Sequence, residues 1–328
     1  MTADTPTLDV RGLKTHFFTK LGVVKAVDGI DFSVGRGEIM GLVGESGSGK
    51  SVTGFSVIGL VDPPGRVTGG EIRFDGEDLV QANEERLRRL RGNRVAMIFQ
   101  DPMMTLNPVL RIDTQMIETV QAHNDVDRET ARQRARDALG QVGIPSPDER
   151  LQAYPHQFSG GMRQRVAIAI ALINKPELII ADEPTTALDV TIQGQILYEV
   201  QKLCRETGTA LIWITHDLAV VAGLADRVCV MYAGRIVEKG AVDDVLDHPT
   251  HPYTRGLIGS VPSHNQRGRR LTQIPGMTPS LLNLQPGCAF RARCPRADEA
   301  CMAEPGISEP VAGREVRCFH PHVEEVAA

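Results

Sequence analysis

The chain is poor in aromatic residues and has no long hydrophobic run. Aromatic residues make up 4% of its 328 residues, with a single Trp, so a broad base-stacking platform for nucleic acid is not expected. The longest unbroken apolar run, Val166 to Ile173, has eight residues, whereas a helix that spans a bilayer needs about 20. The net charge of −5 argues against nucleic-acid binding by bulk positive charge. We therefore expect a chain that neither crosses a membrane nor binds nucleic acid.

A secretory signal is also missing, and cysteine is concentrated at one end. The first ten residues are polar and contain no apolar core of a signal peptide, so we expect the chain to stay in the cytosol. Of the six cysteines, four lie between residues 288 and 328. In a reducing compartment such a cluster suggests metal binding more than disulfides.

Alternating strand and helix patterns predict an α/β domain over residues 1–240. Period-two apolar residues at Leu8 to Phe18 and Val24 to Val34 indicate antiparallel strands. Asp127 to Val142 has one apolar helical face, and Arg163 to Ile173 is typical of a buried helix. Further short strands are predicted at Glu38 to Val43, Gly69 to Phe74, Arg94 to Phe99, Leu178 to Ala181 and Leu211 to Thr215. Beyond these, residues 241–328 are rich in Pro, His, Gly and Cys with little helical periodicity, which predicts a loop-rich second domain.

A phosphate-binding motif follows the strand predicted at Glu38 to Val43. The segment Gly44 to Ser51 fits the pattern GxxxxGK[ST]. Its glycines allow successive N–H groups to point at phosphate oxygens, and the helix beginning near Lys50 adds its positive end. Lys50 reaches the β- and γ-phosphates, and the Ser51 hydroxyl binds Mg²⁺. The predicted nucleotide-binding residues are Gly44, Glu45, Ser46, Gly47, Ser48, Gly49, Lys50 and Ser51.

A second helix start with exposed N–H groups is predicted before the buried helix. Ser159 suits the N-cap position, and Gly160 and Gly161 leave the first N–H groups of the helix open. The helix therefore offers a phosphate-binding end in a chain that has one phosphate loop.

Carboxylate, amide and imidazole side chains follow three of the predicted strands. Asp182 suits coordination of Mg²⁺ through water, and Glu183 suits polarising an attacking water. Gln100 and His216 each end a strand, which places them at the phosphate side of the sheet.

These motifs, in this order, resemble the ATP-binding subunits of ABC transporters from Leu8 to about Gly240. The resemblance implies a P-loop ABC ATPase domain with a mixed sheet core, an antiparallel β subdomain and a helical subdomain at about residues 101–160. It makes Gly44 to Ser51 the Walker A loop. It assigns Gln100 to the Q-loop, with a share in Mg²⁺ binding, and Ser159, Gly160, Gly161 and Met162 to the signature, which acts in trans on a partner's ATP. It makes Asp182 the Walker B aspartate, Glu183 the catalytic base, Asp189 the D-loop residue and His216 the switch histidine. An aromatic residue of the first strand stacks on adenine in the family; Phe17 is our prediction and Phe18 the rival.

A narrower resemblance is to the ATPase subunits of dipeptide and oligopeptide importers. It is carried by Phe99 to Pro108, by His251-Pro-Tyr-Thr254 and by the tail from Ile274 to His320. It implies uptake of dipeptides or oligopeptides, although the subfamily also includes importers for nickel, glutathione and some sugars. The implied partners are a second ABC ATPase subunit, with a heterodimer favoured over a homodimer, and two integral-membrane permease subunits. An extracytoplasmic substrate-binding protein acts indirectly, and the expected location is the cytoplasmic face of the membrane.

Two other classes fit the sequence less well. A soluble ABC ATPase of DNA repair carries a long coiled coil, but only 130 residues without sustained heptads separate Ser51 from Asp182. An iron–sulfur redox protein with regulatory ATP would not need the hydrolytic set that includes Glu183.

Four tail cysteines form a candidate metal centre: Cys288, Cys294, Cys301 and Cys318. Five, six and sixteen residues separate them, which matches no C-x₂₋₄-C pair of a typical zinc site. Iron–sulfur clusters accept more varied spacing, and the resemblance to peptide-importer subunits also points to a [4Fe–4S] cluster. Zinc, and free thiols or disulfides, remain the alternatives.

Overall fold

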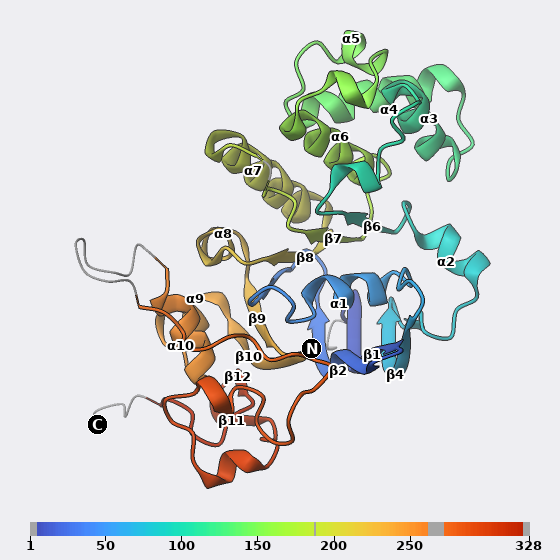
Figure 1. Ribbon diagram of the computed structural model, residues 1–328. Helices are drawn as coiled ribbons and strands as arrows, with labels where there is room; N and C mark the ends of the chain where they lie inside the picture. Colours follow the sequence, from blue (N-terminus) through green and yellow to red (C-terminus); the bar gives the residue numbers. More distant parts are fainter. Residues whose placement is uncertain (1–4, 187, 262–271, 324–328) are drawn as a thin grey trace. The chain divides into compact units, whose positions relative to one another are not determined.

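The computed structural model of the protein describes residues 5–186, 188–261 and 272–323 (Figure 1). The chain forms two compact units, each assembled from segments that are not contiguous in sequence. The first comprises Met1–Leu8, Val34–Ile39 and Phe74–Trp213, and the second Asp9–Ser33, Met40–Arg73 and Ile214–Ala328. Among the described residues, no helix has both the length and the hydropathy that a bilayer span requires.

Buried parallel strands form the core of the first unit. Strands β6 (Val95–Ile98) and β7 (Leu178–Asp182) pair in parallel, with Val95 opposite Leu178. Strand β8 (Ala210–Thr215) is the other neighbour of β7. Every residue of β7 and β8 is buried, as expected for strands covered on both faces. These elements confirm the predicted strands to within one residue at each end.

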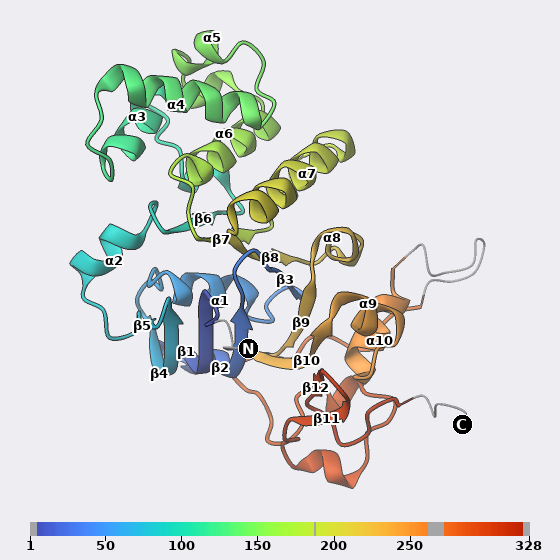
Figure 2. The same ribbon diagram turned by 180° about the vertical axis from the view of Figure 1, so that it is seen from behind.

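Helices make up the rest of the first unit. Helices α3 to α6 gather into one cluster, visible from both sides (Figures 1 and 2). Asp127 begins α4 as predicted, because its side chain accepts from the Thr130 N–H at 2.7 Å. The helices are α2 (Glu84–Leu90), α3 (Ile112–Gln121), α4 (Arg128–Gln141), α5 (Pro147–Leu151), α6 (Gly160–Leu172) and α7 (Val190–Thr207). Shorter elements are β5 (Glu77–Asp78), η1 (Pro102–Met104) and η2 (Pro155–Gln157).

Two sets of strands build the second unit. In the first set, β1 (Leu8–Thr19) lies between β2 (Gly22–Val34) and β4 (Gly65–Phe74). Because two residues connect the neighbours β1 and β2, the pair is an antiparallel hairpin. In the second set, β3 (Ile39–Val43) pairs in parallel with β9 (Arg227–Tyr232). The antiparallel strands β10 (Arg235–Ala241), β12 (Arg314–Val316) and β11 (Ser308–Val311) continue this set. The predicted mixed α/β fold is confirmed.

The part after residue 240 contains more helix than the sequence indicated. Helices α9 (Val242–Asp247) and α10 (Pro252–Gly259) follow β10, after α1 (Lys50–Val57) and α8 (Leu218–Leu224) earlier in the unit. Local capping explains α10: Pro252 occupies the first turn, and the His251 ring accepts from the Tyr253 N–H at 3.0 Å. Burial lowers the pKa of His251 to about 3, so this ring nitrogen stays an acceptor. From residue 272 to 323 the chain is loop-rich, with η4 (Arg291–Arg293), η5 (Glu299–Met302) and the β11–β12 pair. The domain boundary at residue 240 stays a prediction.

A fully buried carboxylate joins β10, β12 and the start of α10. Glu238 accepts from the N–H groups of Thr250 and His251 at 2.7 and 2.8 Å. The Arg314 guanidinium supplies the opposite charge at 2.8 Å. Because all three donors converge on a carboxylate with 0% exposure, each is needed to offset the lost hydration of the charge.

Replacing Arg314 by Met should strongly destabilise the protein, because it leaves Glu238 charged and buried without its counter-charge. We expect a loss of about 3–5 kcal/mol in the free energy of unfolding, measured by urea denaturation. Arg89→Met is the control, since Arg89 pairs with Glu85 on the exposed surface of α2 and such pairs contribute less than about 1 kcal/mol. Equal losses in the two variants would contradict this role for Glu238.

Candidate functional site

The phosphate loop connects β3 to α1 with a backbone that only glycine can adopt at two points. Gly44 has φ 152° and Gly49 has φ 107°, in the region that side chains rarely adopt. A Cβ atom would lie 2.2 Å from the Met231 carbonyl oxygen at Gly44, and 2.2 Å from that of Ala26 at Gly49. The loop is thus pressed against neighbouring backbone on both sides. Its shape therefore depends on both glycines.

Lys50 is buried and bends back over the loop. Its ammonium donates to the carbonyl oxygens of Gly44 and Glu45 at 2.8 and 2.9 Å. The Ser48 hydroxyl is also buried and has no hydrogen-bond partner among the residues that the structure describes. A cation held by weak acceptors and an unsatisfied hydroxyl both fit a phosphate group. In the same loop, Ser46 and Gly47 are exposed, Gly49 is buried and Ser51 is half-buried.

The first unit brings Gln100 and Glu183 together, 83 residues apart in sequence. The Gln100 amide donates to the Glu183 carboxylate at 3.1 Å, and the Thr186 hydroxyl donates to the same oxygen at 3.3 Å. Glu183 has φ 45°, an uncommon backbone conformation for a residue other than glycine. It directly follows Asp182, which ends β7 and is buried. The sequence predicted roles for Gln100, Asp182 and Glu183 but neither the contact between Gln100 and Glu183 nor the part of Thr186.

The helix start at Ser159 is open to solvent. Ser159 caps α6 by accepting from the Met162 N–H at 3.3 Å, which confirms the predicted cap. Ser159 and Gly160 are exposed, whereas Gly161 and Met162 are half-buried. The first N–H groups of a 13-residue helix are therefore placed where a ligand can reach them.

The remaining predicted residues occupy clearly different surroundings. Asp189 caps α7, since its carboxylate accepts from the Ile192 N–H at 3.0 Å. His216 is exposed just after β8. Phe18 is exposed with the Arg66 guanidinium 4.4 Å from its ring centroid, whereas Phe17 is half-buried and its ring lies against Gly65. Which of the two contacts adenine stays a prediction.

All six cysteines are free thiols, so the disulfide alternative does not fit this structure. The Cys288 N–H donates to the Cys301 carbonyl at 3.0 Å, which joins the two segments that carry them. Backbone N–H groups approach two of the sulfur atoms, Arg296 N at 3.4 Å from Cys294 Sγ and His320 N at 3.3 Å from Cys318 Sγ. These contacts place protein donors around the sulfur atoms, as metal–thiolate sites require.

Burial raises the pKa of the Cys318 thiol to about 11, with smaller contributions from the other three tail cysteines. Because burial raises the pKa of the Cys288, Cys294 and Cys318 thiols, a metal that binds them must release protons.

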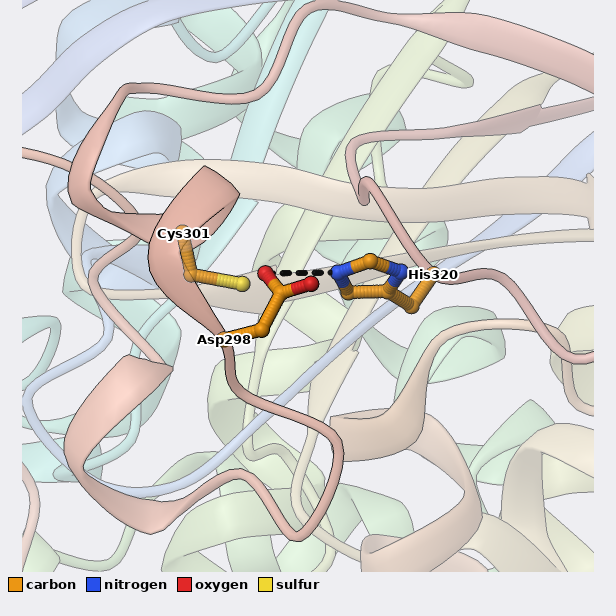
Figure 3. Close-up of side chains that lie close together, drawn as sticks. All are labelled: Asp298, Cys301 and His320. Carbon is orange, nitrogen blue, oxygen red and sulfur yellow. Dashed lines mark ion pairs between the residues drawn. The ribbon is translucent and has the colours of Figure 1, made fainter.

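The structure also places Asp298 and His320 beside Cys301 (Figure 3). One ligand atom from each lies within 4.8 Å of the others. His320 pairs with Asp298 at 2.8 Å and, by its hydrogen bond, lowers the pKa of that carboxyl. In the sequence, His320 and His322 are candidate substitute ligands close to Cys318, whereas Asp298 carried no signal because a lone exposed carboxylate has none.

Comparisons with known proteins give matches along most of the chain, and the matches are to transporters throughout. A family model for ABC transporters matches residues 27–186, and one for the C-terminal region of oligopeptide/dipeptide transporters matches residues 237–301. The oligopeptide transport ATP-binding protein AppD of Bacillus subtilis is 48% identical over 95% of this chain and 96% of its own length. The dipeptide transport ATP-binding protein DppD of Escherichia coli is 47% identical over 96% of both chains.

Solved structures give the same result for the fold. The dimeric structure of MJ0796, a bacterial ABC transporter cassette, aligns with a TM-score of 0.66 and 26% identity. The alignment covers 72% of this chain and 98% of that one. The same cassette is known as a dimer in a post-hydrolysis state bound to ADP and Pi, with the same TM-score of 0.66.

Gly49→Ala should weaken ATP binding by about tenfold or more, because the added methyl group displaces the loop from the Ala26 carbonyl. Titration with a fluorescent ATP analogue and Mg²⁺ measures the effect. Gly76→Ala is the control: Gly76 has φ +80°, but a Cβ there meets open space. It should carry a comparable backbone strain and leave the affinity unchanged. Wild-type affinity in Gly49→Ala would show that the loop tolerates a side chain at this position.

Proposed function

The chain belongs to the ATP-binding subunits of ABC transporters, and from this membership we propose that it hydrolyses ATP to drive uptake of dipeptides and oligopeptides. This membership confirms the resemblance to ABC transporter subunits that the sequence motifs carry. ATP with Mg²⁺ is the ligand of the family. The observation that carries the peptide substrate is the overlap with relatives named for peptide transport. Two of them match at 47–48% identity over 95% or more of both chains.

The phosphate loop holds the nucleotide. N–H groups of Gly47 to Ser51 surround phosphate oxygens, and Lys50 exchanges its two carbonyl acceptors for phosphate. Mg²⁺ suits the oxygen donors of Ser51, Gln100 and Asp182, the last through water. The ion neutralises charge on the phosphates when bound. Phe17 stacks on adenine.

Glu183 orients the attacking water. Its carboxylate accepts hydrogen bonds from Gln100 and Thr186 on one oxygen, Oε2, at 3.1 and 3.3 Å. Both donors fix the orientation of the carboxylate. His216 contacts the γ-phosphate, and Asp189 lies at the boundary with the partner ATPase. Because phosphoryl transfer depends mainly on positioning and charge stabilisation, a fixed carboxylate is what the step requires.

Each ATP needs a signature from a second ATPase subunit. Ser159 and Gly160 are exposed at the start of α6, so the helix end is free to bind a partner's γ-phosphate. The solved cassettes of similar fold are described as dimers. We favour a heterodimer with a related subunit, in which ATP closes the pair and hydrolysis reopens it.

The transporter is completed by two permease subunits at the cytoplasmic face of the membrane, with an extracytoplasmic binding protein that delivers substrate. Met103 and Met104 are the support for a permease contact. Both are exposed, with Met104 62% exposed, whereas Leu106 is buried in the core. Exposed methionines suit an adaptable apolar contact.

The tail cysteines hold a [4Fe–4S] cluster in this proposal. Four free thiols of the loop-rich tail, with backbone N–H groups beside the Sγ atoms of Cys294 and Cys318, supply the donor set. The group is structural: it crosslinks a segment that has little apolar sequence to stabilise it. Zinc on Asp298, Cys301 and His320 is the competing site.

Uptake of a labelled dipeptide into proteoliposomes that carry the full transporter tests the transport function. Glu183→Gln should still bind ATP, but hydrolysis should fall by about 10²-fold and uptake with it. Met104→Asp should keep hydrolysis and lose uptake, whereas Leu21→Asp, at the exposed β1–β2 turn, should keep both. The proposal is wrong if wild-type proteoliposomes hydrolyse ATP without taking up the dipeptide, or if the Glu183→Gln transporter takes it up at the normal rate.

Anaerobic purification should give a brown protein with about four irons per chain. Cys318→Ser should lose the iron, while Cys204→Ala, which removes a buried thiol of α7, should retain it. One zinc per chain in a colourless preparation would instead exclude the cluster.

A further inference from the structure

The phosphate loop is attached to the C-terminal part of the chain through the side chain of Glu45. The Glu45 carboxylate receives both ends of the Arg293 guanidinium, at 2.6 Å on Oε2 and 2.9 Å on Oε1. The Thr278 hydroxyl donates to Oε2 at 3.1 Å. The hydrogen bonds from Arg293 are the main reason that the pKa of Glu45 is lowered, so the carboxylate stays charged. A bidentate pair fixes orientation as well as distance.

The backbone of Glu45 is held from the same part of the chain. Its N–H donates to the Tyr253 hydroxyl at 2.9 Å, and its carbonyl accepts from Lys50. Tyr253 is fully buried, and burial raises its pKa, so the hydroxyl remains neutral. Tyr253 belongs to the His251-Pro-Tyr-Thr254 motif, which has no direct role in the proposed binding or hydrolysis of ATP. Glu45 is therefore fixed through its carboxylate and through its amide.

Arg293 is itself buried and held by several contacts. It is 6% exposed, and its Nε donates to the Pro275 carbonyl at 2.9 Å. The guanidinium lies 5.8 Å from the Tyr232 ring centroid and 6.0 Å from that of Phe290. These rings pack against each other at 5.3 Å. An arginine with all these contacts has a single orientation, and it is directed at Glu45.

We propose that Arg293 is a positioning residue for nucleotide binding. By binding the Glu45 carboxylate, it keeps the first turn of the phosphate loop in the geometry that receives phosphate. It also keeps in place the two carbonyl oxygens that accept hydrogen bonds from Lys50. Arg293 touches no nucleotide atom in this role. The inference rests on the proposed ATP binding but not on transport, on the dimer partner or on the identity of any metal.

Arg293→Met should raise the KM for ATP, and the Kd of a fluorescent ATP analogue, by about tenfold. The kcat should change much less, because the catalytic carboxylate is elsewhere. Arg293→Lys should recover part of the loss, since one donor and the charge remain. The matched control is Arg291→Met on the same 3₁₀ turn, because Arg291 binds Gln285 and the Pro286 carbonyl instead of Glu45. It should behave as the wild type.

A double-mutant cycle with Glu45→Gln decides whether the pair acts as a unit. If it does, the double variant binds ATP no more weakly than Arg293→Met alone. The inference would be overturned if the fold-changes in Kd of the two single variants multiplied in the double variant. Normal ATP affinity in a folded Arg293→Met variant would also overturn it. Urea unfolding of each variant separates a local effect from loss of the fold, and Glu45→Gln serves as the test if Arg293→Met fails to fold. If the wild type itself does not bind ATP, the proposed function fails, and not this inference alone.

Discussion

The buried carboxylate of Glu238 fixes the position of the helix start from which Tyr253 reaches the phosphate loop. It binds the N–H groups of Thr250 and His251, and the His251 ring in turn caps the N–H of Tyr253. The Tyr253 hydroxyl then accepts from Glu45 in the loop. Each step is a hydrogen bond to a buried group, and a buried polar group that loses its partner is costly. This series of hydrogen bonds therefore fixes where the Tyr253 hydroxyl lies, and with it the Glu45 N–H.

Phosphate binding and water activation, the two functions expected of the protein, place different demands on the backbone. Binding phosphate needs closely approaching N–H groups, which glycine permits at Gly44 and Gly49. Activating water needs one carboxylate in a fixed orientation. Glu183, the proposed catalytic base, has a strained backbone and two side-chain donors on its carboxylate. Strain of this kind persists only where the surroundings enforce it, and it is concentrated at functional sites.

Local features of the fold could be predicted from the sequence. Ser159 and Asp127 are capping residues whose role depends on neighbours three residues away, and the strand predictions rest on equally local patterns. The phosphate loop was identifiable because its residue types have no other common use at that spacing. By contrast, no local pattern indicated α9 or the caps that begin α10, because caps outside a periodic segment look like loop residues.

Long-range pairing was the part that could not be predicted. Arg293 and Glu45 are 248 positions apart, and Tyr253 and Glu45 are 208 apart. No local pattern marks one arginine among many as the partner of one glutamate. The same limit applies to Met104 and Leu106, since two neighbouring apolar residues differ in exposure only once the helical cluster is built.

Arg293 and Cys294 are consecutive residues, so the contact that holds the phosphate loop lies directly beside a proposed metal ligand. One planar peptide bond joins them, and their Cα atoms are therefore about 3.8 Å apart. Because the Arg293 guanidinium binds both carboxylate oxygens of Glu45, a single residue separates the Cys294 thiol from the side chain that reaches the phosphate loop. Any ligand of Cys294 would thus bind within one residue of the nucleotide site's support.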